Sequence, residues 1–74
     1  MTCDEVKTLI EQGIEGAVAS VSDLTGTGDH FTATVVAAAF EGKQALEMHR
    51  MVYVALGDAM NGPIHALQLN TRAQ

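Results

Sequence analysis

The segment FEGKQALEMHRMVYVALGDAMNGPIHAL, residues 40–67, contains a strand end, a long helical stretch and the start of another strand. Gly42 breaks the strand that leads into it. Gln44–Met60 is rich in Ala, Leu and Met, and its apolar residues recur at helical spacing. The apolar face of this predicted helix consists of Ala45, Met48, Val52, Ala55, Leu56 and Ala59. Asn61-Gly62-Pro63 ends the helix because Pro cannot continue it. Ile64–Thr71 then alternates apolar and polar residues, which predicts a final strand.

The N-terminal residues predict a first helix over Cys3–Gln12. Thr2 and Glu5 have the spacing of a capping box, in which each side chain hydrogen-bonds the backbone N–H of the other residue. Apolar residues at helical spacing follow. Gly13 is placed to end the helix.

Two strands are predicted between the helices. Ala17–Leu24 carries Val among small residues, and His30–Phe40 is β-branched and apolar, which is typical of a strand. Thr25–Asp29 contains two glycines and reads as a loop. Because this loop is short, we expect the two strands to form an antiparallel hairpin.

The resulting α-β-β-α-β order predicts an α+β fold, with the helices on one face of a small mixed sheet. We expect residues 1–74 to form a single domain. The core should be packed closely from small side chains, because a chain this short buries only ~60% of its unfolded surface. Phe31, Phe40 and Leu56 are the expected core residues, each costing on the order of 2–5 kcal/mol when trimmed to Ala.

Composition and charge narrow the classes of function. The formal net charge is −5 and only Lys7, Lys43, Arg50 and Arg72 are basic, which disfavours a nucleic-acid binder. One cysteine fits a reducing compartment. No apolar run approaches the ~18 residues that span a bilayer, and the N-terminus is acidic where a signal peptide is basic. We therefore expect a cytoplasmic protein.

The spacing of residues along the chain gives little indication of a catalytic or metal-binding site. The chain has no phosphate-binding loop, dinucleotide fingerprint, CxxC or HExxH motif, and no nucleophile paired with a base, so we expect no enzyme. His65 suits either a half-buried strand histidine or a metal ligand. His30 is either a second metal ligand or an exposed strand residue. His49 is interpreted as a helix residue that packs locally. Cys3 should be buried or inert, since Asp4 follows it.

Three other residues, Met48, Met51 and Met60, are expected to fill the core rather than bind a soft metal.

Several short motifs, in order and spacing, resemble the BolA-like family. They are Phe40-Glu41-Gly42-Lys43, His49-Arg50 followed by Met51-Val52-Tyr53, and Ile64-His65-Ala66-Leu67, with Gly28-Asp29-His30-Phe31 at the entry to the second strand. The resemblance covers roughly residues 5 to 71. It implies a fold like that of class II KH domains, which agrees with the element order derived above.

The resemblance also implies a partner and a cofactor. Members of this family pair with monothiol glutaredoxins and share a 2Fe–2S cluster with them, with glutathione supplying a thiolate, in iron–sulfur trafficking and iron homeostasis. The histidine of the Ile-His-Ala-Leu motif is one ligand, and His65 matches it. The loop ligand is a Cys or His; Thr27 occupies the position of the Cys, so His30 is the candidate. Alone, the chain is expected to bind no cluster and to be a monomer or weak homodimer.

The alternative function implied by the resemblance is that of a DNA-binding transcriptional regulator. Lys43, His49 and Arg50 are the candidate contacts, either with nucleic acid or with the partner protein. Met48 replaces an Arg that many members carry, which weakens the DNA interpretation. Many members also continue beyond the last strand with a further helix, whereas this sequence stops at Gln74.

Overall fold

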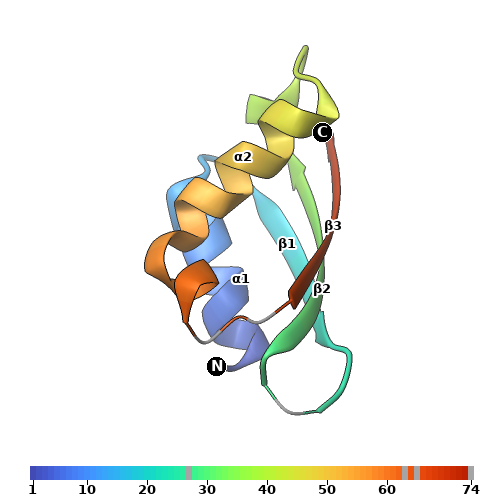
Figure 1. The fold of residues 1–74 in the computed structure, drawn as a ribbon. Coiled ribbons are helices and arrows are strands. Elements are labelled where there is room, and N and C mark those ends of the chain that lie inside the picture. The colour runs from blue at the N-terminus through green and yellow to red at the C-terminus, as the bar shows by residue number, and fades with distance from the viewer. Residues whose placement is uncertain (27, 63, 65, 74) are drawn as a thin grey trace.

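The computed structural model of the protein describes residues 1–26, 28–62, 64 and 66–73. Its elements are α1 (Cys3–Gly13), β1 (Val18–Asp23), β2 (His30–Ala37), the 3-10 helix η1 (Ala38–Phe40), α2 (Ala45–Leu56), the 3-10 helix η2 (Gly57–Asn61) and β3 (Ala66–Ala73). The two α-helices cover one face of a three-stranded sheet, so the α+β fold predicted from the sequence is confirmed (Figure 1).

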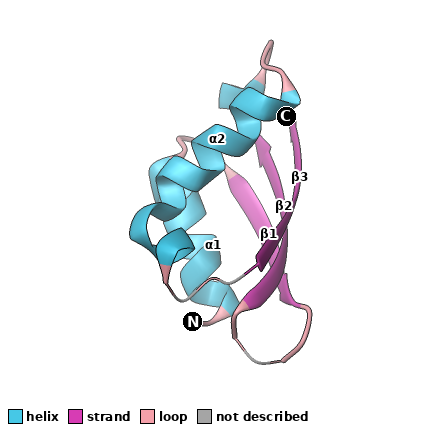
Figure 2. Cartoon of the chain, in the orientation of Figure 1, coloured by secondary structure: helices cyan, strands magenta, loops and turns pink. Residues whose placement is uncertain are grey.

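The strand β2 lies in the centre of the sheet and pairs with both other strands. It runs antiparallel to β1, with Val18 opposite Val36, as the predicted hairpin requires. It runs parallel to β3, with His30 opposite Ala66 at the start and Ala37 opposite Ala73 at the end. Because β2 and β3 are parallel, they begin at the same end of the sheet (Figure 2). The segment that connects them contains α2 and η2.

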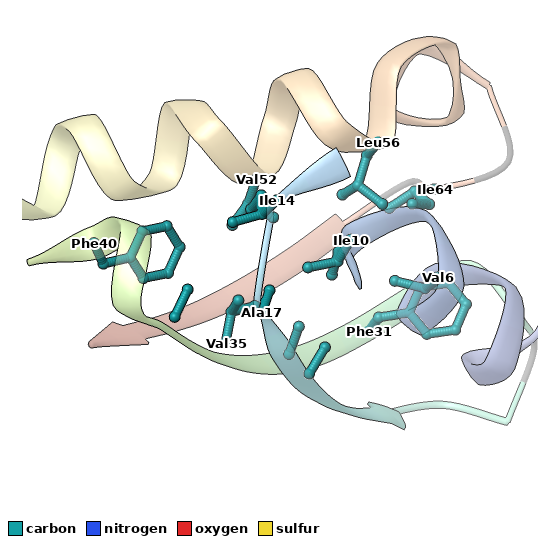
Figure 3. Close-up of a cluster of buried hydrophobic side chains, with 13 residues drawn as sticks. Val6, Ile10, Ile14, Ala17, Phe31, Val35, Phe40, Val52, Leu56 and Ile64 are labelled. Atoms are coloured by element: carbon teal, nitrogen blue, oxygen red, sulfur yellow. The ribbon is translucent and has the colours of Figure 1, made fainter. Parts of the chain in front are cut away.

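Burial alternates along β2, which separates its two faces. Phe31, Ala33, Val35 and Ala37 are buried beneath the helices, while the residues between them are only half-buried. Phe31 and Phe40 are fully buried and Leu56 is 3% exposed, so the three expected core residues are confirmed. Figure 3 shows Phe40 at one end of the core and Phe31 beside Val6 at the other. The complete cluster comprises Val6, Ile10, Ile14, Ala17, Ala19, Phe31, Ala33, Val35, Ala37, Phe40, Val52, Leu56 and Ile64.

The capping box at the start of α1 is present. The Glu5 N–H donates to the Thr2 hydroxyl over 3.1 Å, and the Thr2 N–H donates to the Glu5 carboxylate over 2.9 Å. The backbone hydrogen bond from Thr2 and then its hydroxyl hold the pKa of Glu5 below its ordinary value.

Several predicted boundaries are wrong. The second strand ends at Ala37 rather than Phe40, because the next three residues turn as η1 and carry the Phe40 ring into the core. The long helix ends at Leu56, where Gly57 adopts a positive φ of 56° and the backbone tightens into η2. The last strand begins at Ala66, two residues later than predicted, and extends to Ala73.

One predicted face also needs correction. Ala45 is exposed, so the apolar face of α2 begins at Met48. In β3, Ala66 is exposed, while Leu67 and Leu69 are half-buried and pack against the core. The three methionines, Met48, Met51 and Met60, pack against the core as expected, and so does the half-buried thiol of Cys3.

The prediction that α1 ends at Gly13 is confirmed. This glycine is the last residue of the helix, and a Cβ at this position would lie 2.5 Å from the Cβ of Ala55 and 2.8 Å from its Cα. Real Cβ atoms do not approach so closely, so the missing side chain lets α1 and α2 touch.

None of the described helices is long and apolar enough to span a membrane.

We predict that Gly13→Ala lowers the free energy of unfolding by about 1–3 kcal/mol, because the added methyl overpacks the contact between the helices. Helix propensity alone would stabilise the protein by about 1 kcal/mol, so the sign of the change is diagnostic. Chemical denaturation measures it. Ala55→Gly in the same chain should recover part of the loss, since it removes the nearer of the two clashing atoms. A more stable Gly13→Ala variant would contradict the close approach.

Candidate metal-binding end of the sheet

The loop between β1 and β2 is organised by one carboxylate. Asp23 is the last residue of β1, and its Oδ1 accepts from the N–H groups of Thr25 at 3.2 Å and Gly26 at 2.9 Å. Its Oδ2 accepts from the Gly28 N–H at 2.8 Å. Asp commonly caps turns in this way. The loop therefore has a defined conformation where it enters β2.

His30 stands at the first position of β2, at the end of this loop. Its Nδ1 lies 2.7 Å from the Oδ1 of Asp29, and the two side chains are 34% and 41% exposed. An ionised carboxylate can only accept a hydrogen bond, so Nδ1 is the donor, and whenever the ring is neutral its lone pair lies on Nε2. Metal-binding histidines are commonly held by a carboxylate in this manner.

The first residues of β3 lie beside His30. The Ala66 N–H donates to the backbone oxygen of Asp29 over 3.1 Å, and Ala66 is the partner of His30 in the parallel ladder. Ile64 is buried in the core, and its N–H donates to the Ala59 oxygen over 2.9 Å. Ala66 is thus held against the end of the loop, and Ile64 is held in the core against η2.

The predicted ligand His65 itself, and Thr27 at the position of the family's loop cysteine, lie outside the described residues. Among the residues that are described, no group of three or more His, Cys, Asp or Glu side chains could hold a metal ion. The described part of the site is therefore the pair of Asp29 and His30.

The other predicted contact residues lie at the opposite end of the sheet. Lys43 is exposed in the turn before α2, where its N–H donates to the Phe40 oxygen over 3.0 Å. His49 is half-buried and Arg50 is exposed, both in the first half of α2 (Figure 1). The structure therefore separates the candidate ligand His30 from these three residues.

Sequence reasoning missed the role of Asp23. An Asp directly before a segment with alternating glycines is the signal of a side-chain-capped turn, and it was available in the residues 23–28. Asp29 was noted in the loop, but its contact with the ring of His30 was not predicted.

Comparison with known proteins decides the family. The family model described as BolA-like protein matches residues 10–74. The chain belongs to the BolA-like family. The BolA-like chain is similar to BolA-like protein 1 of Bos taurus, with 32% identity over 74 residues, covering 90% of this chain and 55% of that protein. It thus spans little more than half the length of this relative.

Two further relatives agree with the assignment of this chain to the BolA-like family. A solved structure of a BolA protein homologue from Coxiella burnetii is 43% identical, has a TM-score of 0.83, and is matched over 96% of this chain and 88% of that one. The DNA-binding transcriptional regulator BolA of Escherichia coli is 37% identical over 46 residues, which cover 62% of this chain and 44% of that protein. The resemblance drawn from the motifs is therefore confirmed.

We predict that Asp23→Ala loosens the loop of this BolA-like chain, because three backbone N–H groups lose their acceptor. Amide hydrogen exchange at Thr25, Gly26 and Gly28 should become faster, and the free energy of unfolding should fall by about 1 kcal/mol. Glu15→Ala, which removes the same charge from an exposed position after α1, is the matched control. Unchanged exchange at the three amides would show that the Asp23 contacts do not hold the loop.

Proposed function

We propose that this chain is a non-enzymatic adaptor that pairs with a monothiol glutaredoxin and shares a 2Fe–2S cluster with it, in iron–sulfur cluster trafficking and iron homeostasis. His65 and His30 would be the ligands from this chain. The partner and glutathione would supply thiolates. Membership of the BolA-like family supports the proposal, together with the arrangement of Asp29 and His30 beside the start of β3.

The number of available donors supports a shared cluster. A 2Fe–2S cluster usually takes four protein ligands, mostly cysteine thiolates. This sequence has a single cysteine, Cys3, and it packs against the core. Imidazoles can replace thiolates on one iron of such a cluster. The donor set thus fits a chain that contributes histidine and takes its thiolates from a partner.

The single observation that carries the ligand assignment is the contact between Asp29 and His30. The 2.7 Å hydrogen bond fixes the ring orientation and the tautomer, which leaves the lone pair on Nε2. The backbone of Asp29 also receives the first hydrogen bond of β3, so one residue positions both strands of the proposed site. The single cysteine fits a reducing compartment, so we propose that the chain pairs with the glutaredoxin in the cytoplasm.

The test is to mix the apo protein with a cluster-loaded monothiol glutaredoxin and glutathione, and to record visible absorption and circular dichroism. The wild-type protein should change the spectrum of the glutaredoxin cluster. His65→Ala should abolish the change, and His30→Ala should weaken it. Asp29→Asn should weaken binding by about 10–100-fold, because it releases the ring that it orients.

Glu15→Ala is the control, since it alters an exposed position after α1 that is neither a candidate ligand nor a candidate contact, and it should leave the spectrum of the mixture as in wild type. A spectrum identical to that of the glutaredoxin alone would contradict cluster sharing. Loss of the change in His49→Ala but not in His30→Ala would show that the ligands are assigned to the wrong end.

A DNA-binding function is the second candidate. Lys43, Arg50 and Arg72 are exposed and gather at one end of the molecule, because Arg72 pairs with Val36 at the end of β2 and η1 leads from there to Lys43. The name of the Escherichia coli relative gives this candidate weight. Against it stand Glu41 and Glu47 at the same end, and the net charge of −5.

If this end binds duplex DNA, we expect a weak, salt-sensitive complex. Three phosphate contacts would give a plot of log K against log salt concentration with a slope of about −3. Electrophoretic or anisotropy titration at several salt concentrations measures it, and Lys43→Glu should reduce the slope by about one. No binding at low salt would exclude the DNA function.

A further inference from the structure

The sheet has two edges, and only one of them is protected. At the β1 edge, the Glu11 carboxylate accepts the outward N–H of Ala19 over 3.0 Å. That edge is also short and ends in the acidic residue Asp23. Capping groups, charges and short length are the devices that keep sheet edges from pairing. The β1 edge therefore carries all three.

The β3 edge is longer and has no capping side chain among the described contacts. β3 has eight residues, Ala66–Ala73, with no proline and no acidic residue, and Arg72 near its end is its single charged residue. Ala66 bonds to the β2 side, so alternate residues of this parallel strand do the same. The backbone groups of Leu67, Leu69 and Thr71 consequently point away from the sheet. Figure 1 shows β3 at the edge of the sheet, and no other helix or strand of the described residues lies beyond it.

We propose that β3 pairs edge to edge with β3 of a second copy of this chain, antiparallel and in a two-fold register centred on Leu69. In this register Leu67 faces Thr71 of the second copy, and Leu69 faces its own counterpart. Each of these outward-facing residues then exchanges backbone hydrogen bonds with a residue whose groups also point outward. The two sheets would join into one continuous sheet.

The side chains are compatible with this register on both faces. Leu67 and Leu69 are half-buried at the margin of the core, so Leu69 meeting its counterpart extends the apolar layer under the helices. On the other face, the exposed Gln68 lies opposite the exposed Asn70 of the second copy. No two like charges face each other.

Charge complementarity favours a second copy over an unrelated strand. The register places Arg72 opposite Ala66 of the second copy, and Ala66 is small, exposed and paired with His30. Two strand spacings separate Arg72 from the β2 position of His30, about 10 Å, so the side chains of Arg72 and of the neighbouring Asp29 would close this gap together by leaning toward each other across Ala66. The two-fold axis produces this contact twice, joining the basic end of each copy to the acidic loop end of the other.

Because a seam of two strands is smaller than a standard protein interface of about 1,600 Å², we expect a weak dimer. Sedimentation equilibrium over a range of concentrations up to about 1 mM should show reversible dimer formation. Arg72→Glu should raise the dimer Kd about tenfold, since two favourable contacts become repulsive. Lys43→Glu, the same charge change at the same end but outside β3, should have a smaller effect.

The register has its own test in a Cys3→Ser background. Gln68→Cys and Asn70→Cys alter two exposed positions that face each other across the proposed seam, where Cα atoms of such a pair lie about 4.5 Å apart and within disulfide range. An equimolar mixture of the two variants under a glutathione redox buffer should yield the mixed disulfide in excess over both homodimers.

A purely statistical distribution of the three disulfides would overturn the register. A protein that stays monomeric up to about 1 mM would overturn the pairing itself. Equal effects of Arg72→Glu and Lys43→Glu on the Kd would overturn the contact between the Arg72 end and the acidic loop. Far-UV circular dichroism of each variant confirms that the fold is intact before these comparisons are made.

Discussion

The parallel pairing of β2 with β3 is the contact on which the rest of the structure depends. It joins residues 30–37 to residues 66–73, so the intervening chain, which contains α2 and η2, must return the backbone to the same end of the sheet. Such long-range pairing costs loop entropy, and burial of the crossover helix against the sheet offsets that cost. Because the strands are parallel, both begin at the same end. The Asp29–His30 pair therefore lies beside Ala66.

Much of the fold could be predicted because its determinants are local. The capping box of Thr2 and Glu5 identifies the start of α1, and the β-branched run after His30 identifies the central strand. The features that were missed or predicted wrongly depend on contacts that the sequence does not display. Gly13 was correctly identified as the end of α1, but its close contact with Ala55 was not predicted. Gly57 interrupts a stretch whose apolar spacing continues on both sides, so periodicity concealed the end of α2.

The candidate site was predictable in its residue types and less so in its geometry. His30 and His65 were identified from motifs, and His65 lies outside the described residues. The hydrogen bond between Asp29 and His30 joins neighbours in sequence, yet a strand directs consecutive side chains to opposite faces. Only the turn at the entry to β2 brings the two side chains together. The loop that makes this turn is in turn held by Asp23.

The unequal distribution of charge along the molecule has a consequence for how it meets other proteins. Its extents are 35 × 19 × 19 Å, and Asp4, Glu5, Asp23 and Asp29 lie toward the end that holds the loop and the start of α1. Lys43, Arg50 and Arg72 lie toward the other end, where Glu41 and Glu47 offset part of their charge. This charge distribution gives the molecule an electric dipole along its long axis. The electric field of an approaching molecule therefore orients the protein before contact. Ionic strength should then act mainly on the rate of encounter, and much less on the lifetime of a complex once formed.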